Sequence, residues 1–368
     1  MQNGHRRLRI AQVSPLHESV PPRRYGGTER VVSYLTEELV ARGHDVTLFA
    51  SGDSQTSAKL VAGCPEALRL GGSRDPLAAH LRMFEDIARR SSEFDLIHFH
   101  VDYLHFGVTR RCEYTHVTTL HGRLDLPESV QLYRSFPEMP LVSISDAQRD
   151  PLPELDWAAT VHHGLPPDLY RLDDCPGDYL AFVGRISPEK RLDLAIEIAR
   201  RAKLPLRVAA KIDGADREYF SEVITPLLRR ADVELVGEIG DDQKQEFFGK
   251  ARALVFPIDW PEPFGLVMIE AMACGAPVIA FRRGSVPEVL EDGVTGFICE
   301  DVEQAVHAVE RLPELSRATC RREFERRFTA GRMAEDYLTT YRHLIARNHD
   351  GRHAAVAGLL HPGNQRAS

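Results

Sequence analysis

The chain has 368 residues, of which 43% are hydrophobic and 27% charged, and its formal net charge is −8 at pH 7. This balance is typical of a soluble globular protein, and the length suggests two domains of ordinary size. The negative charge argues against a nucleic-acid-binding protein, and no apolar run approaches the ~20 residues of a membrane span. Residues 1–15 lack the apolar segment of a signal peptide and the cysteines form no C-x-x-C pair, so we expect a cytoplasmic protein with free thiols.

Strand-like and helix-like segments alternate along the first half of the chain. A helix is predicted over residues 28–43, where apolar residues recur at helical spacing between an N-cap candidate, Thr28, and a C-cap glycine, Gly43. The segments that predict strands are β-rich and run over residues 8–14, 44–51, 94–100, 116–122 and 140–146. This succession of strands and helices indicates a parallel, doubly wound sheet.

A stretch rich in proline, glycine and acidic residues, 162–178, interrupts the alternation, which then restarts and continues through residues 179–299. We therefore predict two Rossmann-like α/β domains, over residues 1–170 and 171–348, with an active-site cleft between them. The last predicted helix, about residues 331–348, is expected to pack back on the N-terminal domain. Residues 349–368 are expected to form a flexible tail.

The first candidate site precedes the first helix. The phosphate-binding patterns G-x-x-x-x-G-K-[ST] and G-x-G-x-x-G are absent from the sequence. Instead, Gly26 and Gly27 in the segment RYGGTE would let the backbone approach a ligand closely, and a helix N-terminus there would direct N–H groups at an anion. The alternative is a plain turn that leads into the helix, and the sequence leaves both open.

Arg185 and Lys190 follow the first strand of the second domain, in the segment FVGRISPEKR. An arginine and a lysine at this spacing can converge on one diphosphate, the arginine as a planar fork and the lysine as a point charge. The alternative is a pair of solvated loop charges, as most charged loop residues are.

Two glutamates, Glu262 and Glu270, stand in the segment WPEPFGLVMIEAMACG. Glu262 lies in a loop with two prolines, whereas Glu270 falls within an apolar helix that Gly275 closes. A carboxylate in such surroundings is costly unless a partner hydrogen-bonds it. That partner is either a ligand with vicinal hydroxyls, such as a ribose, or an internal salt bridge or helix cap.

Several of the sixteen histidines end strands. His98 and His100 share one face of a strand, where strand-end packing or substrate contact is favoured over a metal site. His121 ends an apolar strand just before a glycine, which is where active-site groups of such sheets appear. His162 and His163 fall in the stretch between the domains and are interpreted as structural.

The basic segment CRREFERRF, residues 320–328, has two interpretations. One is a peripheral contact with a membrane surface, and the other is a solvated helix face. The interleaved glutamates favour the second, because mixed-sign charge is typical of a solvated helix.

Taken together, these segments resemble the retaining glycosyltransferases of family 4, also described as glycosyl transferases group 1, which have the GT-B fold. The pieces that carry the resemblance are GGTE, TLHG, FVGR-x4-K, ELVGEIG, PEPFGLVMIEAMACGAPVIA and GSVPEVLEDGVTGFIC. The last two are highly specific, with two glutamates separated by seven residues and Phe-Gly between them. The opening SPLHESVPPRRYGGTE is similar to a bacterial branch that includes avilamycin-type enzymes.

Two positions depart from the family's pattern. Arg191 stands where many members have a glycine after the lysine, which adds local charge. The run from His163 to Pro166 replaces a common N-G-V/I-D linker and so alters the hinge region. Neither departure removes a residue of the donor site.

The resemblance implies an acceptor-binding N-terminal domain and a C-terminal domain that binds a nucleotide sugar. Arg185 and Lys190 would stabilise the leaving diphosphate, while Glu262 would contact the donor hexose. His121 would lie by the anomeric centre, near the hexose 6-position. The other residues implied in donor binding are Glu270 at the ribose, Glu238 and Ile239 at the base, Gly26 and Gly27 over the phosphates, and the backbone of Phe264, Gly265 and Leu266 at the sugar and phosphate.

The implied reaction moves a hexose from a UDP-, GDP- or ADP-linked donor to an acceptor hydroxyl with retention. In the family's usual account a donor phosphate oxygen takes the proton of the acceptor, so no dedicated base is needed. We expect no metal and no other cofactor, because Arg185, Lys190 and the glycine-rich helix start offset the charge of the leaving group.

The acceptor is expected to be a saccharide, a lipid-linked compound or a small aglycone, and nothing in the sequence indicates the oligomeric state. Two alternative functions stay open. One is a sugar-nucleotide epimerase of the same fold, and the other is a non-catalytic nucleotide-sugar-binding protein.

Overall fold

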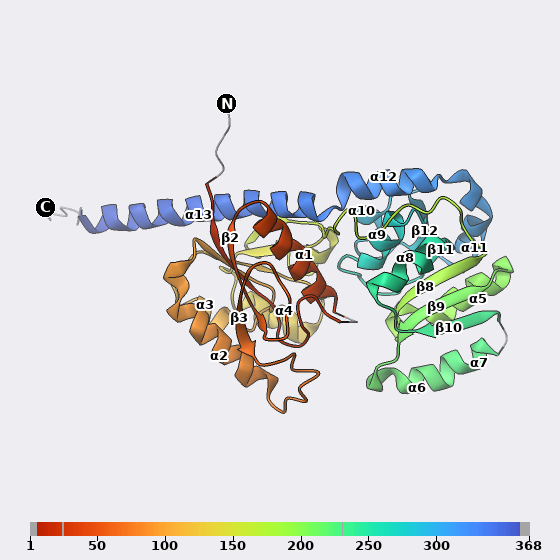
Figure 1. Ribbon diagram of the computed structural model, residues 1–368, viewed down its shortest axis with the longest axis horizontal. Helices are drawn as coiled ribbons and strands as arrows, with labels where there is room; N and C mark the ends of the chain where they lie inside the picture. The colour runs from red at the N-terminus through yellow and green to blue at the C-terminus, as the bar shows by residue number, and fades with distance from the viewer. Residues whose placement is uncertain (1–5, 24–25, 230, 361–368) are drawn as a thin grey trace, which may run out of the picture.

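Two α/β domains, each built on one parallel sheet, lie side by side in the computed structural model (Figure 1). The structure describes residues 6–23, 26–229 and 231–360, with side chains up to residue 348. The first sheet ends at Thr160 and the second begins at Tyr179. The predicted architecture of two doubly wound domains is confirmed.

The N-terminal domain carries a seven-stranded sheet in the order β3-β2-β1-β4-β5-β6-β7. Its strands are β1 (Arg9–Val13), β2 (Asp45–Ser51), β3 (Lys59–Cys64), β4 (Leu96–Phe99), β5 (His116–Thr119), β6 (Leu141–Ser143) and β7 (Trp157–Thr160). Its helices are α1 (Gly27–Ala41), α2 (Pro76–Arg89), α3 (Phe106–Thr109) and α4 (Pro127–Arg134).

The C-terminal domain carries a six-stranded sheet in the order β10-β9-β8-β11-β12-β13. Its strands are β8 (Tyr179–Arg185), β9 (Leu206–Lys211), β10 (Val233–Gly237), β11 (Ala251–Phe256), β12 (Val278–Phe281) and β13 (Gly296–Cys299). Its helices are α5 (Leu192–Ala202), α6 (Arg217–Tyr219), α7 (Thr225–Leu228), α8 (Asp241–Gly249), α9 (Leu266–Ala273), α10 (Val286–Val289), α11 (Val302–Arg311) and α12 (Arg317–Arg327).

The central strands are buried on both faces, which explains why their sequences are nearly continuous apolar runs. Strands β3 and β7 were not predicted from the sequence. Strand β7 forms one edge of its sheet with every residue half-buried, and β3 forms the other edge with a mixed burial pattern. Their apolar runs, LVAGC and WAA, are short and lack the alternation of a half-buried strand. Apart from Glu270, helix α9 is apolar on all sides, because it packs within the core of its domain.

Strand order reverses beside β1 in the first sheet and beside β8 in the second. At such a switch point the loops after neighbouring strands diverge and leave a crevice at the carboxyl ends of the strands. The loops after β1, β5, β8 and β11 therefore lead toward the space between the domains, and they carry the candidate residues discussed below.

The last helix, α13 (Ala330–Leu360), leaves the C-terminal domain beside α12 and runs along the N-terminal domain (Figure 1). Its buried face, which includes Met333, Tyr337, Tyr341 and Leu344, packs on the core formed by β1, β4, β5 and α1. The helix continues to Leu360 where we expected a flexible tail from residue 349, and residues 361–368 lie outside the described part of the chain.

The chain passes between the domains twice, near residues 164–165 and 328–330, and these two segments lie against each other. Leu165 donates its backbone N–H to the Phe328 carbonyl at 2.9 Å and accepts from the Ala330 N–H at 2.7 Å. A Cβ on Gly164 would lie 2.2 Å from the Thr329 carbonyl oxygen, so only glycine permits this approach. The altered linker sequence thus fits a hydrogen-bonded pair of crossing segments.

The basic segment predicted at residues 320–328 lies in and just after α12. Arg321 donates to the carbonyls of Tyr170 and Ala273 at 2.6 and 2.8 Å, and Arg326 pairs with Glu323. Much of this charge is therefore used within the protein. Within the described residues no helix combines the length and the apolar character needed to cross a membrane.

Candidate active site

A cleft of about 660 Å³ lies between the two domains, where the carboxyl ends of the two sheets meet. The structure brings every residue predicted for the site to the wall of this one cleft. These residues are Gly26, Gly27, His121, Arg185, Lys190, Glu238, Ile239, Glu262, Phe264, Gly265, Leu266 and Glu270. The neighbours of Gly26 in the predicted segment, residues 24 and 25, lie outside the described part of the chain.

Two helices begin at the cleft, one from each domain. Gly26 and Gly27 start α1, and Gly265 caps α9 with a φ of 78°, a left-handed conformation that favours glycine. A Cβ on Gly26 would lie 2.7 Å from Pro22 Cβ, which explains the need for glycine there as well. Free N–H groups at such helix ends attract anions.

Glu270 is the most buried acid of the cleft, with 2% of its surface exposed. Its Oε1 accepts a hydrogen bond from the Lys244 ammonium at 2.7 Å, whereas its Oε2 is buried without a partner. The internal salt bridge considered for this residue therefore exists, but it occupies one oxygen. The other oxygen can accept a hydrogen bond from a ligand hydroxyl.

Lys190 and Glu262 form an ion pair in the cleft, with 2.5 Å between Nζ and Oε2. The indole N–H of Trp260 donates to the same Glu262 oxygen at 2.8 Å, and the Lys190 ammonium lies 4.7 Å from the centre of that indole ring. An anionic ligand would therefore have to displace the Glu262 carboxylate in order to pair with Lys190.

Arg185 lies at the end of β8 with 37% of its side chain exposed. Its guanidinium pairs with Glu189 at 2.5 Å, and the carboxylates of Asp216 and Asp213 lie 3.6 and 3.9 Å away. Arg185 is therefore more than a solvated loop charge, because three acids lie within 3.9 Å of its guanidinium, of which Glu189 also lines the cleft.

Glu238 and Ile239 line the cleft in the loop between β10 and α8. Phe264 is 2% exposed, and its ring lies 4.9 Å from the His163 ring and 6.1 Å from the Phe328 ring. Its side chain thus belongs to the wall, as expected for a residue whose predicted ligand contacts are made by its backbone.

His121 follows β5 and faces the cleft from the N-terminal domain. Its Nε2 lies 2.9 Å from His100 Nδ1, and its ring stacks on that of His163 at 5.3 Å between centres. Burial lowers the pKa of His121 to about 3, because a charged imidazole would lose its hydration. The ring is therefore neutral at physiological pH and is a weak base.

Glu29, in the first turn of α1, is another acid on the cleft wall. Its side chain is largely buried, and the loss of hydration raises the pKa of its carboxyl to about 7. Because this value lies near neutral pH, Glu29 is the carboxyl of the cleft best suited to exchange a proton.

Several residues of the cleft were missed by the sequence analysis. Lys244 stands on α8 with no motif around it, and Arg30 on α1 forms an interdomain ion pair with Asp241 of α8. Trp260 could have been predicted as a residue of the cleft, because it stands two residues from Glu262, a predicted sugar contact. His163, interpreted as structural, is 3% exposed and packs against His121, and it also lines the cleft.

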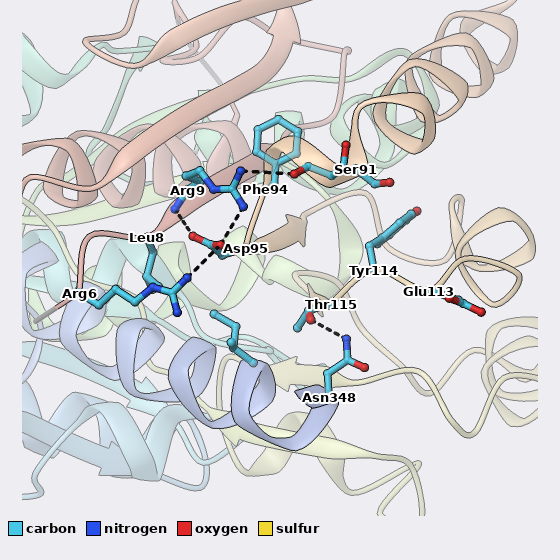
Figure 2. Close-up of a pocket in the computed structure, with 12 residues that line it drawn as sticks. Arg6, Leu8, Arg9, Ser91, Phe94, Asp95, Glu113, Tyr114, Thr115 and Asn348 are labelled. Carbon is cyan, nitrogen blue, oxygen red and sulfur yellow. Dashed lines mark hydrogen bonds and ion pairs between the residues drawn. The ribbon is translucent and has the colours of Figure 1, made fainter. Parts of the chain in front are cut away.

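A second cavity, of about 430 Å³, lies at the amino ends of β1, β4 and β5 and is lined by none of the predicted residues (Figure 2). There Asp95 accepts from Arg9 at 3.0 Å and pairs with Arg6 at 3.7 Å. On the facing wall Asn348 of α13 donates to the Thr115 hydroxyl at 2.6 Å. These groups are satisfied within the protein, so we attribute the cavity to the docking of α13.

Two family models match the chain. Residues 25–150 match the model described as Glycosyltransferase Family 4, and residues 176–328 match the model described as Glycosyl transferases group 1. The two matches follow the two domains of the structure, and each includes predicted site residues.

Curated relatives share a shorter segment. The D-inositol 3-phosphate glycosyltransferase of Streptomyces scabiei is 32% identical over 177 residues, which cover 42% of this chain and 40% of the relative. The enzyme of the same name from Mycobacterium leprae is 33% identical over 181 residues, with the same coverage. The matched part is thus about two fifths of each relative's length.

Solved structures match nearly the whole chain. AviGT4, a glycosyltransferase involved in avilamycin A biosynthesis, gives a TM-score of 0.73 at 24% identity and covers 92% of this chain and 98% of its own. HepE of Anabaena, solved in complex with UDP-glucose, gives 0.69 at 15% identity, with 94% and 100% covered. These likenesses establish the GT-B fold. With both domain models matched in order, the chain belongs to the family 4 glycosyltransferases.

Proposed function

We propose that this protein is a retaining glycosyltransferase that moves a hexose from a nucleoside-diphosphate sugar to an acceptor hydroxyl and needs no divalent metal. The observation that carries the proposal is the unpartnered Oε2 of Glu270, buried on the wall of the interdomain cleft. A buried carboxylate oxygen without a donor is costly, and a ribose hydroxyl would satisfy it.

The surroundings of Glu270 suit the rest of such a donor. The α9 N-terminus, Lys190 and Arg185 together offer the N–H dipoles and positive charge that a diphosphate requires. The relatives support the same class of donor, since HepE binds UDP-glucose and other relatives are named glycosyltransferases. We extend this property to the present chain, with UDP, GDP or ADP as the nucleotide.

The chemistry follows from where charge develops. As the bond between the anomeric carbon and the phosphate oxygen breaks, negative charge grows on the diphosphate. Lys190 and Arg185 would then interact more strongly with the leaving group than with the resting donor, which lowers the barrier. The acceptor oxygen bonds to the same face of the sugar, and its proton passes to a phosphate oxygen of the donor.

The low basicity of His121 supports this assignment of the proton. A histidine with a pKa of about 3 gains little by accepting a proton at neutral pH, so we assign His121 to a hydrogen bond with the donor hexose. Its neutral ring can accept a bond from a hydroxyl without placing a charge beside the anomeric centre.

Metal independence rests on residues that can replace a cation. The sequence has no D-x-D motif after a strand to hold a metal–diphosphate pair, and Lys190 and Arg185 supply fixed positive charge instead. Turnover should therefore persist in EDTA. Complete loss of turnover that magnesium or manganese restores would overturn this part of the proposal.

The decisive experiment has two steps. A thermal-shift panel of UDP, GDP, ADP and TDP and their hexose derivatives identifies the nucleotide, because a ligand that binds the native state raises its melting temperature. Nucleotide release is then measured with and without candidate acceptors. Acceptor-dependent release supports a transferase. Binding without release would support a sensor, and hexose isomerisation without transfer would support an epimerase.

A further inference from the structure

Polar side chains replace apolar ones at the carboxyl ends of the three central strands of the N-terminal domain. Ile10, Leu96 and Val117 lie in the core beneath α13, and Gln12 and His98, two residues further along their strands, lie on the same face. Thr119 likewise follows Val117 by two residues on β5 and lies on the same face as Val117. Each of these polar side chains is fully buried, although the mechanism above uses none of them.

These side chains form one continuous path of hydrogen bonds from α13 to the cleft. His121 Nε2 lies 2.9 Å from His100 Nδ1, and His100 Nε2 lies 2.8 Å from Gln12 Oε1. The Gln12 amide nitrogen donates to the Tyr341 hydroxyl at 3.1 Å, and that hydroxyl lies 2.6 Å from His98 Nδ1. The path thus joins residues 329 positions apart in sequence, Gln12 and Tyr341.

The direction of each bond follows from the amide of Gln12, which has one donor and one acceptor end. Since its nitrogen donates to Tyr341, its oxygen must accept from His100 Nε2–H. Burial lowers the pKa of His100 well below its ordinary value, so the ring is neutral and carries a single proton. Its Nδ1 is then bare and accepts from His121 Nε2–H. His121 Nδ1, which forms no hydrogen bond with the described residues, is left as an acceptor.

We propose that Tyr341, through Gln12 and His100, is a positioning residue that fixes the Nε2–H tautomer of His121 and so leaves Nδ1 as the hydrogen-bond acceptor offered to the cleft. Turning the Gln12 amide over would reverse every bond in the path and move the proton of His121 to Nδ1. In the native arrangement the Tyr341 hydroxyl would donate its proton to His98 Nδ1, 2.6 Å away, and its oxygen would accept from the Gln12 amide nitrogen, which opposes the turned amide. The last helix of the chain would thus govern a group in the cleft that it does not line.

The consequence for substrate rests on the proposed function. A bare Nδ1 accepts from a hexose hydroxyl, whereas an Nδ1–H would have to donate to one. The tautomer of His121 therefore determines whether the ring accepts a hydrogen bond from the donor sugar or donates one to it. The affinity for the nucleotide does not change.

The test begins with the free enzyme, labelled with ¹⁵N-histidine, in which the ring nitrogen shifts distinguish protonated from bare nitrogen. His121 is assigned by the signals lost in His121→Gln. We expect a single Nε2–H tautomer in the native protein and a mixture in Tyr341→Phe. A native Nδ1–H tautomer, or an unchanged tautomer in Tyr341→Phe, would overturn the proposal.

Leu344→Ala is the control for loosening of the helix, because Leu344 lies on α13, is 3% exposed and packs in the same core without a polar side-chain atom. It should lose similar stability and keep the His121 tautomer. If it mixes the tautomers as Tyr341→Phe does, general loosening of α13 explains the effect and the proposal fails.

Binding separates this inference from the proposed function. Tyr341→Phe should raise the KM for the nucleotide sugar about 2- to 10-fold, as for the loss of one neutral hydrogen bond, and leave the Kd of the free nucleoside diphosphate unchanged. A shifted tautomer with an unchanged KM would confirm the path from α13 and refute the contact between His121 and the donor hexose.

Discussion

The ammonium of Lys244 holds one carboxylate oxygen of Glu270 at 2.7 Å, and the second oxygen of Glu270 is buried without a partner. The two residues come from different helices, α8 and α9, and both line the cleft. The lysine occupies only one oxygen of the buried acid, so a ligand hydroxyl can bind the second oxygen without displacing the lysine.

Glu270→Ala should chiefly weaken donor binding. A hydrogen bond to a charged group contributes about 1.5–3 kcal/mol, so the donor KM should rise about 10- to 150-fold. The fold should survive because Asp241 remains 3.7 Å from the Lys244 ammonium. Calorimetric titration with the nucleotide measures the effect, and Glu246→Ala, which removes an exposed acid of the neighbouring helix α8, is the control. Unchanged donor affinity in Glu270→Ala would place the ribose elsewhere.

Arg185→Ala and Lys190→Ala should each lower kcat by about 10²–10³, the usual effect of removing one positioned electrostatic group. If these residues only bound the resting diphosphate, KM would rise and kcat would stay nearly constant. Initial rates at saturating donor distinguish the two cases, with circular dichroism to show folding. Arg201→Ala, which removes a surface ion pair to Glu303, is the control. Wild-type kcat in a folded Arg185→Ala enzyme would refute the assigned role.

Lys190→Arg should rescue only part of the lost activity, because a planar fork cannot take the place of a compact ammonium between Glu262 and the Trp260 ring. The double variant of Arg185 and Lys190 should lose less than the product of the single losses, since both would act on one leaving group. A double-mutant cycle on kcat measures this coupling, and strict additivity would indicate two independent roles.

Glu29→Gln should leave kcat within about tenfold of the native value if the donor phosphate accepts the proton. A general base typically contributes about 10²–10⁴-fold, so a loss of that size would identify Glu29, with its pKa of about 7, as the base. NMR of the product gives an independent answer. Retained anomeric configuration agrees with our mechanism, and inversion would contradict it.

The stability of the protein should fall as the pH falls below about 6.5. Burial lowers the pKa of several histidines, so the unfolded chain binds protons in this range that the folded chain does not. Each such group can contribute about 1.4 kcal/mol per pH unit. These histidines are His98, His100, His105 and His163, with pKa values well below the ordinary one, His116 at about 4 and His121 at about 3.

Two buried acids act in the opposite direction, because burial raises the pKa of Glu29 to about 7 and of Asp102 to about 6. In the folded protein these two carboxyls bind protons at a higher pH than in the unfolded chain. Their protonation therefore raises the free energy of unfolding as the pH falls through these values. The histidines outnumber them, and the net effect is a loss. Urea titrations at pH 7.5, 6.5 and 5.5 measure it, and equal stability at all three values would contradict the prediction.

The sequence by itself determined the central strands, the first helix and the location of the site. Apolar runs and helical periodicity are local patterns. Arg185 ends such a strand, and Lys190 and Glu262 stand in the segments that follow such strands. Parallel sheets bring the carboxyl ends of their strands to one edge, so the predicted residues had to gather at the same side of each domain. Their presence around one cleft followed from this geometry, and the roles assigned to them stay predictions.

Only the tertiary structure decided the partners of these residues. Lys244 for Glu270, Asp241 for Arg30 and Tyr341 for Gln12 are separated by 26, 211 and 329 positions, and no local pattern connects them. Buried polar groups must be paired, but which group supplies the pairing depends on which faces meet when helices and domains pack. The sequence therefore indicated where charge and hydrogen bonds would be needed, and the packing of α8 and α13 determined what satisfies them.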